Sequence, residues 1–293
     1  MEIVLAFDIG GTHSRAAATT PTGFVLRRAQ APTPAGLAEG LAMLWDLSRS
    51  VVADDTVTSI GVSIGGPLDW RTGIVSPLHQ PAWRGVPLRA ILADRFGCPN
   101  FIDVDTNIAA AAEYLADGRR PGRLLYLTLS TGMGGGFVVD GRIYRGTEDA
   151  HPEIAHQAIA YRCRHPERVV CECGAVGCLE ALISGNGIRR IYGVPAEALD
   201  GDAWDEVAFN LGQGLRNLTV ILAPDVIVLG GSVALGGAAR LLDGATTVMR
   251  EHLRIVPPPD VRLSTLGADS PLLGAIAVAR LGYDPIGPAA HAR

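Results

Sequence analysis

The sequence predicts an α/β protein with two lobes, and three observations support this fold class. The chain has 293 residues, more than most single domains contain. Short apolar runs typical of strands alternate along it with longer segments of helical periodicity. Two glycine-rich turns, one in each half of the chain, each join a pair of strand-like runs. We therefore expect two related lobes of the βββαβα type, each containing one of these hairpins.

Composition and charge narrow the class of protein further. Hydrophobic residues make up 48% of the chain and charged residues 19%, which leaves enough apolar material for two cores. A net charge of −5 argues against a nucleic-acid surface, because a phosphate backbone requires basic residues. The apolar runs are too short or too interrupted to span a bilayer, and Met1 leads directly into a strand without the features of a signal peptide. We therefore expect a cytoplasmic protein that binds neither nucleic acid nor membrane.

Apolar alternation and helical periodicity place the individual elements. In the first part of the chain we expect strands at 3–8, 14–20, 23–30, 57–64 and 100–104, helices at 35–51, 87–96 and 105–116, and a loop at 77–85. In the second part we expect strands at 124–129, from 137, at 225–229 and at 261–266, and helices at 184–192, 195–199, 203–222, 238–252 and 271–281. We expect a small lobe formed by residues 1–117 together with the C-terminal helix segment 271–284. The large lobe is expected to be residues 118–270, which include the loop with the clustered cysteines. The tail 285–293 is expected to be disordered.

The first glycine-rich turn follows the apolar run 3–7 and contains Gly10, Gly11 and Thr12. It lacks the ending of a Walker loop and is followed by a strand instead of a helix. Glycine can adopt positive φ and bring backbone N–H groups close to an anion. We therefore expect these three residues to bind a phosphate, and Asp8 at the strand end to hold Mg²⁺ through water.

The second glycine-rich turn lies between the apolar runs 124–129 and 137–139. In isolation it could be an ordinary tight hairpin. Because it is a second turn of the same kind, we interpret both as loops that clamp a triphosphate between two lobes. The residues expected to contact the phosphates are Thr131, Gly132, Gly134 and Gly135. A third turn, Gly230-Gly231, joins a buried strand to a helix and is either a ligand loop or a plain turn.

Asp105 lies where strand 100–104 meets an alanine-rich helix, and it has two interpretations. It could be a helix cap worth about 1 kcal/mol. Alternatively, its carboxylate could accept the proton of a hydroxyl group that attacks the γ-phosphate. The residues around it leave both interpretations open.

Three of the five cysteines, Cys171, Cys173 and Cys178, lie close together in the sequence. This spacing is too tight for a clear disulfide framework, and an acidic cytosolic enzyme keeps its thiols reduced. Three thiolates and one imidazole form a closed tetrahedral zinc site, and His156 is near enough to supply the imidazole. The glycines within the cysteine segment permit the tight turns that such a site needs. We expect a structural zinc ion; the alternative is three unrelated thiols in a loop.

Five segments occur in the order seen in one known family: AFDIGGTHSRAA at 6–17, LSTGMGGGFVVDGRIYRG at 129–146, HPEIAH at 151–156, CECGAVGCLE at 171–180 and VIVLGGSV at 226–233. The chain thus resembles the ROK family (repressors, open reading frames and sugar kinases) over essentially its whole length. The resemblance implies a two-lobed actin-like ATPase/hexokinase fold, which is ribonuclease H-like, with an interdomain cleft. It also implies ATP-dependent phosphorylation of a hexose, with Mg²⁺ and structural zinc, by a homodimer. Only seven residues precede Asp8, so we do not expect the DNA-binding domain of the repressors.

The resemblance also implies roles for individual residues. Asp105 corresponds to the catalytic base in the family pattern Asn-Asp-x-Asn, whereas Val104 departs from its first position, where the family's Asn commonly binds the sugar. Gly230 and Gly231 correspond to the turn that flanks adenosine. His156 corresponds to the fourth zinc ligand. The residues that the resemblance places at the sugar are Gly66, His79, Asn107, Glu153, His156 and Glu180.

The choice of sugar is less well determined. The cysteine cluster resembles that of glucokinases and N-acetylmannosamine kinases, whereas His151-Pro152-Glu153 resembles a segment of ROK fructokinases. We favour glucose, phosphorylated at O6, with fructose, N-acetylmannosamine and N-acetylglucosamine as alternatives. A sugar or nucleotide sensor without catalysis is the competing class, and the retained Asp8, Asp105 and phosphate loops argue against it. A phosphoryl donor other than ATP, such as polyphosphate, is not excluded.

Overall fold

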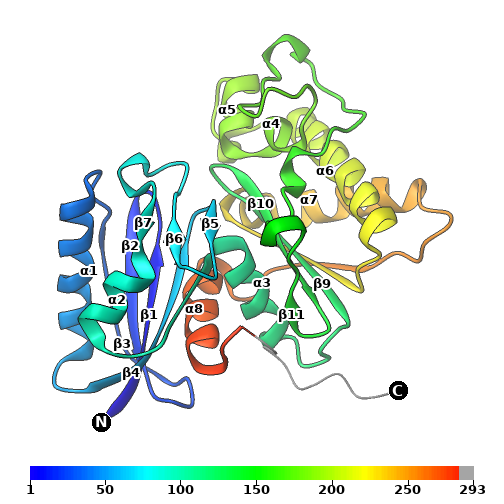
Figure 1. Cartoon of the computed structure of the whole chain (residues 1–293). Helices are drawn as coiled ribbons and strands as arrows, with labels where there is room; N and C mark the ends of the chain where they lie inside the picture. The colour runs from blue at the N-terminus through cyan, green and yellow to red at the C-terminus, as the bar shows by residue number, and fades with distance from the viewer. Residues whose placement is uncertain (284–293) are drawn as a thin grey trace. The chain divides into compact units, whose positions relative to one another are not determined.

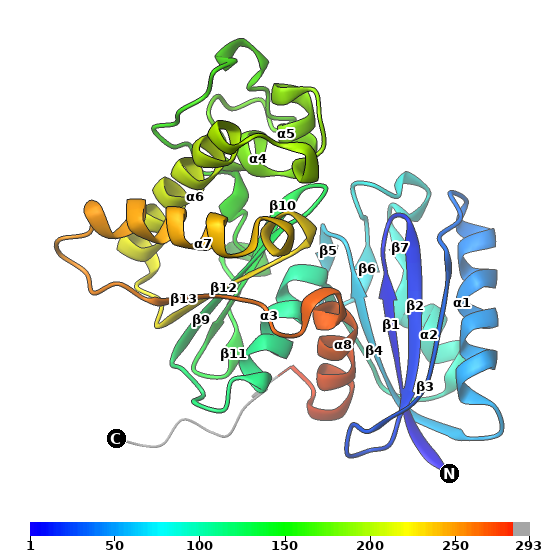
Figure 2. The same ribbon diagram turned by 180° about the vertical axis from the view of Figure 1, so that it is seen from behind.

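A computed structural model of the chain describes residues 1–283 (Figures 1 and 2). The chain divides into two compact units. Unit 1 comprises Met1–Arg120, Asp140–Ala150 and the C-terminal segment from Asp269, and unit 2 comprises Pro121–Val139 and His151–Ala268. Residue 284 and the tail 285–293, for which disorder was expected, lie outside the described residues. Within residues 1–283, every helix is too short or too polar to cross a membrane.

Unit 1 is built on a five-stranded sheet in the order β3-β2-β1-β4-β8. Its strands are β1 (Glu2–Ile9), β2 (His13–Thr19), β3 (Val25–Pro32), β4 (Thr56–Ile64) and β8 (Asn100–Val104). The first three strands form an antiparallel meander, whereas β4 and β8 run parallel to β1. Ile9 pairs with Ile64, and Ile64 pairs with Val104, so three parallel strands end side by side. Residues that follow these ends meet at one edge of the sheet, where ligands commonly bind in open α/β sheets.

Helices cover both faces of this sheet (Figures 1 and 2). They are α1 (Leu37–Val52), α2 (Leu88–Phe96), α3 (Asp105–Ala116) and α8 (Ser270–Leu281). α1 packs on β2 and β3, and α8 packs on β1, β4 and α3. A Cβ at Gly61 of β4 would lie 1.9 Å from the carbonyl oxygen of Ala275 in α8, so this close approach requires glycine. Phe7, Leu44 and Ile102 are fully buried in the core of the unit.

The stretch between β4 and α2 contains three short strands that the sequence did not predict. They are β5 (Leu68–Asp69), β6 (Ile74–Val75) and β7 (Val86–Pro87), which pair in an antiparallel sheet. Strands of two residues carry no periodic signal, so the sequence indicated only a loop at 77–85. Within that loop lies the 3-10 turn η1 (Pro81–Trp83), whose Trp83 is fully buried. Segment 140–150 adds β11 (Arg142–Ile143) and the turn η2 (Thr147–Asp149) to unit 1.

Unit 2 repeats the strand pattern of unit 1. β9 (Arg123–Leu129) lies between β10 (Met133–Val139) and β12 (Val226–Gly230), and β13 (Asp260–Leu263) lies beyond β12. β10 is antiparallel to β9, whereas β12 and β13 are parallel to it. The two glycine-rich hairpins, β1–β2 and β9–β10, therefore occupy equivalent places in two related sheets, as the sequence predicted.

The glycine-rich turn of unit 2 is shorter than the sequence predicted. β10 begins at Met133, so Gly134 and Gly135 are strand residues, and the turn itself is Ser130–Gly132. Packing favours glycine at this position of the strand, because a Cβ at Gly135 would lie 2.0 Å from Ile154 Cδ1 and 2.9 Å from the carbonyl oxygen of Tyr126. A sequence pattern cannot distinguish a glycine required by packing from one required by a turn. The prediction that Gly134 and Gly135 lie in the turn itself is therefore wrong.

The helices of unit 2 are α4 (Leu179–Ile183), α5 (Gly185–Tyr192), α6 (Gly201–Leu222) and α7 (Ser232–Glu251). The unit also contains the 3-10 turns η3 (Ile154–His156), η4 (Pro166–Arg168) and η5 (Ala196–Ala198). A further 3-10 turn, η6 (Gly267–Asp269), lies where the chain passes from unit 2 to unit 1. α6 and α7 pack against each other. α7 begins six residues before the predicted start at 238, and Ala238, with a φ of 41°, marks a kink inside it. Gly236 and Gly237 lower the helical propensity just before that point, which explains the late predicted start.

Candidate active site and metal centre

The predicted ligand residues of unit 1 lie at the carboxyl edge of its parallel strands. Asp8 is near the end of β1, Gly65 and Gly66 follow β4, and Asp105 follows β8 as the first residue of α3. The register of the three strands places these positions next to one another. Asp105 is partly exposed, and its Oδ1 accepts a hydrogen bond from Thr106 N at 2.7 Å. Its position in the first helical turn at this edge agrees with the sequence prediction.

The β1–β2 hairpin presents an exposed tip at residues 10–12. The carbonyl oxygen of Gly10 accepts hydrogen bonds from Thr33 Oγ1 at 2.7 Å and from Gln80 Nε2 at 3.3 Å. Because these bonds fix the peptide group, the tip can present N–H groups to an anion in a defined orientation. A Cβ at Gly11 would lie 4.0 Å from His79 Cβ. The predicted sugar contact His79 is therefore next to the predicted phosphate loop.

Arg15 is a candidate functional residue that the sequence analysis missed. Its Nη2 and Nε donate to Asp8 Oδ2 at 2.6 and 3.0 Å, and its Nη1 donates to Asp269 Oδ1 at 3.1 Å. Asp8 and Arg15 are paired directly across β1 and β2, and opposite charges in such positions attract each other, so the hairpin register was a usable signal. The Arg15 guanidinium offsets part of the negative charge of the Asp8 carboxylate. Asp8 is therefore better suited to contact Mg²⁺ through water than directly.

Asn107, a predicted sugar contact, is buried beneath this edge. It is 1% exposed, and its Nδ2 donates to Asp103 Oδ1 at 3.0 Å. Its own Oδ1 has no hydrogen-bond partner among the described residues. This arrangement brings Asn107 close to Asp105 along α3 but keeps it from the surface. Asn107 is placed to orient Asp103 and the first turn of α3.

Asp103 is fully buried and forms an ion pair with Arg145. Arg145 Nη2 lies 2.5 Å from Asp103 Oδ2, and the guanidinium lies over Trp70, 4.1 Å from the ring centre, and 5.6 Å from the ring centre of Tyr283. A buried carboxylate requires such a counter-charge. The ion pair links segment 140–150 to Asp103 in β8, and Asp103 lies two residues before Asp105 in the sequence. The signal for it in the sequence was an acidic residue inside an otherwise apolar strand.

Replacing Arg145 by methionine is expected to lower the free energy of unfolding by about 3–5 kcal/mol, because the buried Asp103 carboxylate loses its counter-charge. Adding Asp103→Asn removes that charge and keeps an acceptor for Asn107, so the double variant should recover much of the loss. Urea unfolding followed by circular dichroism measures both changes. Arg84→Met removes an exposed arginine and is the matched control, with an expected change below about 0.5 kcal/mol. Equal stability of Arg145→Met and the control would contradict this role of the ion pair.

The turn after β9 lies at the equivalent edge of unit 2. β12 ends in register with β9, since Gly230 pairs with Thr128. Gly231 follows with a φ of 87°, and a Cβ there would lie 2.3 Å from the backbone of β9, so this turn requires glycine. The structure therefore brings the predicted phosphate contacts Thr131 and Gly132 next to the predicted adenosine turn.

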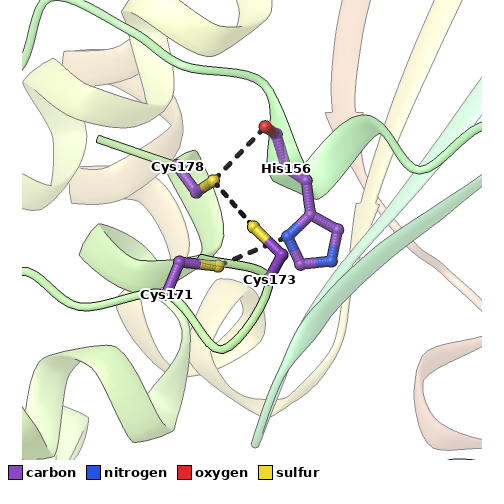
Figure 3. Close-up of side chains that lie close together, drawn as sticks. All are labelled: His156, Cys171, Cys173 and Cys178. Carbon is purple, nitrogen blue, oxygen red and sulfur yellow. Dashed lines mark hydrogen bonds between the residues drawn. The ribbon is translucent and has the colours of Figure 1, made fainter. Parts of the chain in front are cut away.

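The four predicted zinc ligands lie together in unit 2 (Figure 3). The ligand atoms of His156, Cys171, Cys173 and Cys178 all lie within 4.8 Å of one another. His156 Nδ1 is 3.4 Å from Cys171 Sγ, and Cys173 Sγ is 3.5 Å from Cys178 Sγ. In a tetrahedral site with zinc–sulfur bonds of about 2.3 Å, neighbouring ligand atoms are about 3.5–3.8 Å apart. The cluster therefore fits a zinc ion with small adjustments.

The loop geometry and the thiol acidities are consistent with such a centre. Gly174 and Gly177 have φ values of 85° and 77°, so the turns between the cysteines use the left-handed backbone that favours glycine. Burial raises the pKa of Cys171 and raises that of Cys178 to about 12. A hydrogen bond from the Ala175 N–H lowers the pKa of Cys173 to about 7. Zinc would therefore have to displace protons from the two buried thiols at neutral pH.

Two predicted sugar contacts of unit 2, His156 and Glu180, lie at this centre. His156 turns Nδ1 toward the cysteines, and Figure 3 shows its other ring nitrogen pointing away from them. One nitrogen can thus bind a metal while the other donates to a hydroxyl group. Glu180 Oε2 lies 3.7 Å from His156 Nδ1, and the exposed Glu153 lies 3.3 Å from His151 Nε2. Unit 1 holds the remaining contacts, where the carbonyl oxygen of Gly66 accepts from Leu78 N at 3.0 Å.

Comparison with known proteins identifies the family of the chain. The chain matches the family model described as the ROK family over residues 4–281. The N-acetylmannosamine kinase of Yersinia pseudotuberculosis serotype O:1b is 30% identical over 295 residues, which cover 94% of this chain and 98% of that protein.

Two solved structures share the fold. The ROK hexokinase from Thermus thermophilus is 33% identical, with a TM-score of 0.81 over 95% of this chain and 98% of that one. A ROK family glucokinase from Streptomyces griseus, in complex with glucose and AMPPNP, is 25% identical, with a TM-score of 0.79 over 96% and 100% of the two chains. These similarities confirm the predicted two-lobed actin-like ATPase/hexokinase fold class.

Proposed function

The chain belongs to the ROK family and is a sugar kinase, and on that premise we propose that it transfers the γ-phosphoryl group of ATP to O6 of glucose. The observation that carries the proposal is the place of Asp105. It begins a helix at the edge of the sheet where Asp8 and the glycines after β4 also lie. The glucokinase complex with glucose and AMPPNP supports both the sugar and the donor.

In the proposed reaction, Asp105 accepts the proton of the sugar hydroxyl as its oxygen attacks the γ-phosphorus and ADP leaves. Its hydrogen bond from Thr106 N holds the carboxylate in place on the helix. Gly10 N and Ser130 N donate to carbonyl oxygens within their own hairpins. The phosphates would therefore be bound through the backbone N–H groups of Gly11, Thr12, Thr131 and Gly132 and the hydroxyls of Thr12 and Thr131. Gly230 and Gly231 would lie beside the adenosine. Most of the rate in such transfers comes from positioning and electrostatics.

Two metals would assist this chemistry. Asp8 would hold Mg²⁺ through water, and the ion would offset charge on the β- and γ-phosphates when bound. His156 and the three clustered cysteines would hold a structural zinc ion. The zinc would fix the segments that carry Glu153 and Glu180.

Carboxylate and imidazole side chains suit a sugar, because neighbouring hydroxyl groups are donors that pair with such acceptors. The direct contacts proposed are Gly66, His79, Glu153, His156 and Glu180, whereas Asn107 would act through Asp103. N-Acetylmannosamine is the second candidate sugar, because a relative 30% identical over nearly the whole chain is an N-acetylmannosamine kinase.

A coupled assay of ADP formation tests the proposal, with ATP, Mg²⁺ and, in turn, glucose, fructose, mannose, N-acetylmannosamine and N-acetylglucosamine. We expect kcat/KM to be highest for glucose, by at least about tenfold, because a site built around hydroxyl groups rejects an epimer that leaves its polar groups unpaired. A higher value for another sugar would show that the assigned substrate is wrong. Formation of the sugar phosphate itself is measured with ATP and with polyphosphate in parallel, and product formed only with polyphosphate would show that the assigned donor is wrong.

A further inference from the structure

The phosphate turn of unit 2 is held by the segment that follows the metal cluster. Gly185 N donates to the carbonyl oxygen of Ser130 at 2.7 Å, and Asn186 N donates to that of Thr131 at 3.0 Å. On the far side of the turn, Met133 N donates to Glu180 Oε1 at 3.1 Å. Three contacts from segment 180–186 therefore hold a turn of three residues.

Glu180 differs from the other two contacts because it acts through a side chain. Its Oε1 faces the turn, where a Cβ at Gly132 would lie 3.0 Å away, and its Oε2 lies 3.7 Å from His156 Nδ1. The two oxygens of one carboxylate thus face the predicted nucleotide turn and the predicted sugar and metal site. A residue that contacted only a sugar would not need the bond to Met133 N.

The backbone connects the same residue to the metal cluster. Cys178 is the N-cap of α4, and Glu180 lies in the first turn of this five-residue helix. Leu179 N donates to the carbonyl oxygen of Gln157 at 3.0 Å, which ties the start of α4 to the residue after His156. The side chain of Cys178 is itself fully buried. The position of Glu180 is therefore set by both segments that carry the clustered residues: the cysteine segment that precedes it and the segment of His156.

We propose that Glu180 is a positioning residue for the nucleotide, in addition to its proposed contact with the sugar. By accepting from Met133 N it holds the end of the turn 130–132, so that the N–H groups of the turn are oriented for the phosphates before any sugar binds. The inference rests on the proposed function, because it assumes that this turn binds the phosphates of ATP.

Binding of AMPPNP with Mg²⁺, measured by isothermal titration calorimetry in the absence of sugar, tests this role. Glu180→Ala removes the carboxylate that accepts from Met133 N. We expect it to weaken AMPPNP binding about tenfold, which is the typical effect of losing one hydrogen bond to a charged group. Glu180→Gln keeps an acceptor oxygen of the same reach and should stay within about threefold of the unmodified protein. Glu197→Ala, which removes an exposed carboxylate elsewhere in unit 2, should leave binding unchanged.

Unchanged or tighter AMPPNP binding by Glu180→Ala would overturn the inference and leave Glu180 as a sugar contact alone. Failure of the unmodified protein to bind AMPPNP would instead overturn the proposed function. If Glu180→Ala does not fold, Glu180→Met replaces it, because methionine keeps the length of the side chain but removes the carboxylate that accepts from Met133 N. The same loss of about tenfold is then expected, and unchanged AMPPNP binding by Glu180→Met would overturn the inference.

Discussion

Replacing Asp105 by asparagine is expected to lower kcat by about 10²- to 10⁴-fold, because the proposed base can no longer accept the proton of the sugar hydroxyl. Asparagine has the same shape, and its Oδ1 can keep the hydrogen bond from Thr106 N. We therefore expect the fold and the KM for the sugar to change little. A coupled kinase assay with the preferred sugar gives kcat and KM, and circular dichroism checks the fold.

Asp94→Asn is the matched control, since it removes an exposed carboxylate of the same unit. Its kcat should equal that of the unmodified protein. If Asp105 served only the helix, as the capping interpretation holds, Asp105→Asn would cost about 0.3–1 kcal/mol of stability and leave kcat unchanged. A kcat within tenfold of the unmodified protein would rule out Asp105 as the base.

The long elements of the fold could be predicted from the sequence because their patterns are local. Strand β8 and helix α3 have the predicted bounds, and α6 begins two residues before its predicted start. Elements whose identity depends on distant contacts could not be predicted. The strands β5, β6 and β7 have two residues each and exist only as a sheet. Gly135 looked like part of a turn, whereas the side chain of Ile154 is what excludes a larger residue there.

The candidate site shows the same division between local and distant information. The cysteine cluster and the two glycine turns are visible as short segments, and the structure places the four expected metal ligands together. Arg15, Asp103 and Arg145 were missed because their significance lies in their partners. Arg145 is separated from Asp103 by 42 residues, and an arginine in a loop gives no sign of a buried carboxylate. A buried acidic residue signals that a partner exists, but only the fold shows which residue it is.

Removing the zinc centre is the second change with a large expected effect. The purified protein is expected to contain about one zinc ion per chain, and Cys178→Ser should abolish zinc binding, because a closed tetrahedral site needs all four ligands. Cys178 is fully buried and pairs with Ala158, two residues after His156, in an isolated β-bridge. Losing its bond to the metal should therefore also release the segments that carry His156 and Glu180. We therefore expect loss of sugar binding together with a lower melting temperature. Elemental analysis, calorimetric titration with glucose and thermal unfolding measure these three effects.

Two cysteines outside the cluster provide matched controls for this experiment. Cys98 and Cys163 are partly buried thiols, and neither is among the four clustered ligands. Cys98→Ser and Cys163→Ser should keep the full zinc content and sugar affinity. Because burial raises the pKa of Cys171 and Cys178, zinc binding releases protons, so the affinity for zinc should fall as the pH falls. A metal-free preparation with full activity would contradict the structural role of zinc, since the sugar contacts would then be held by the polypeptide alone.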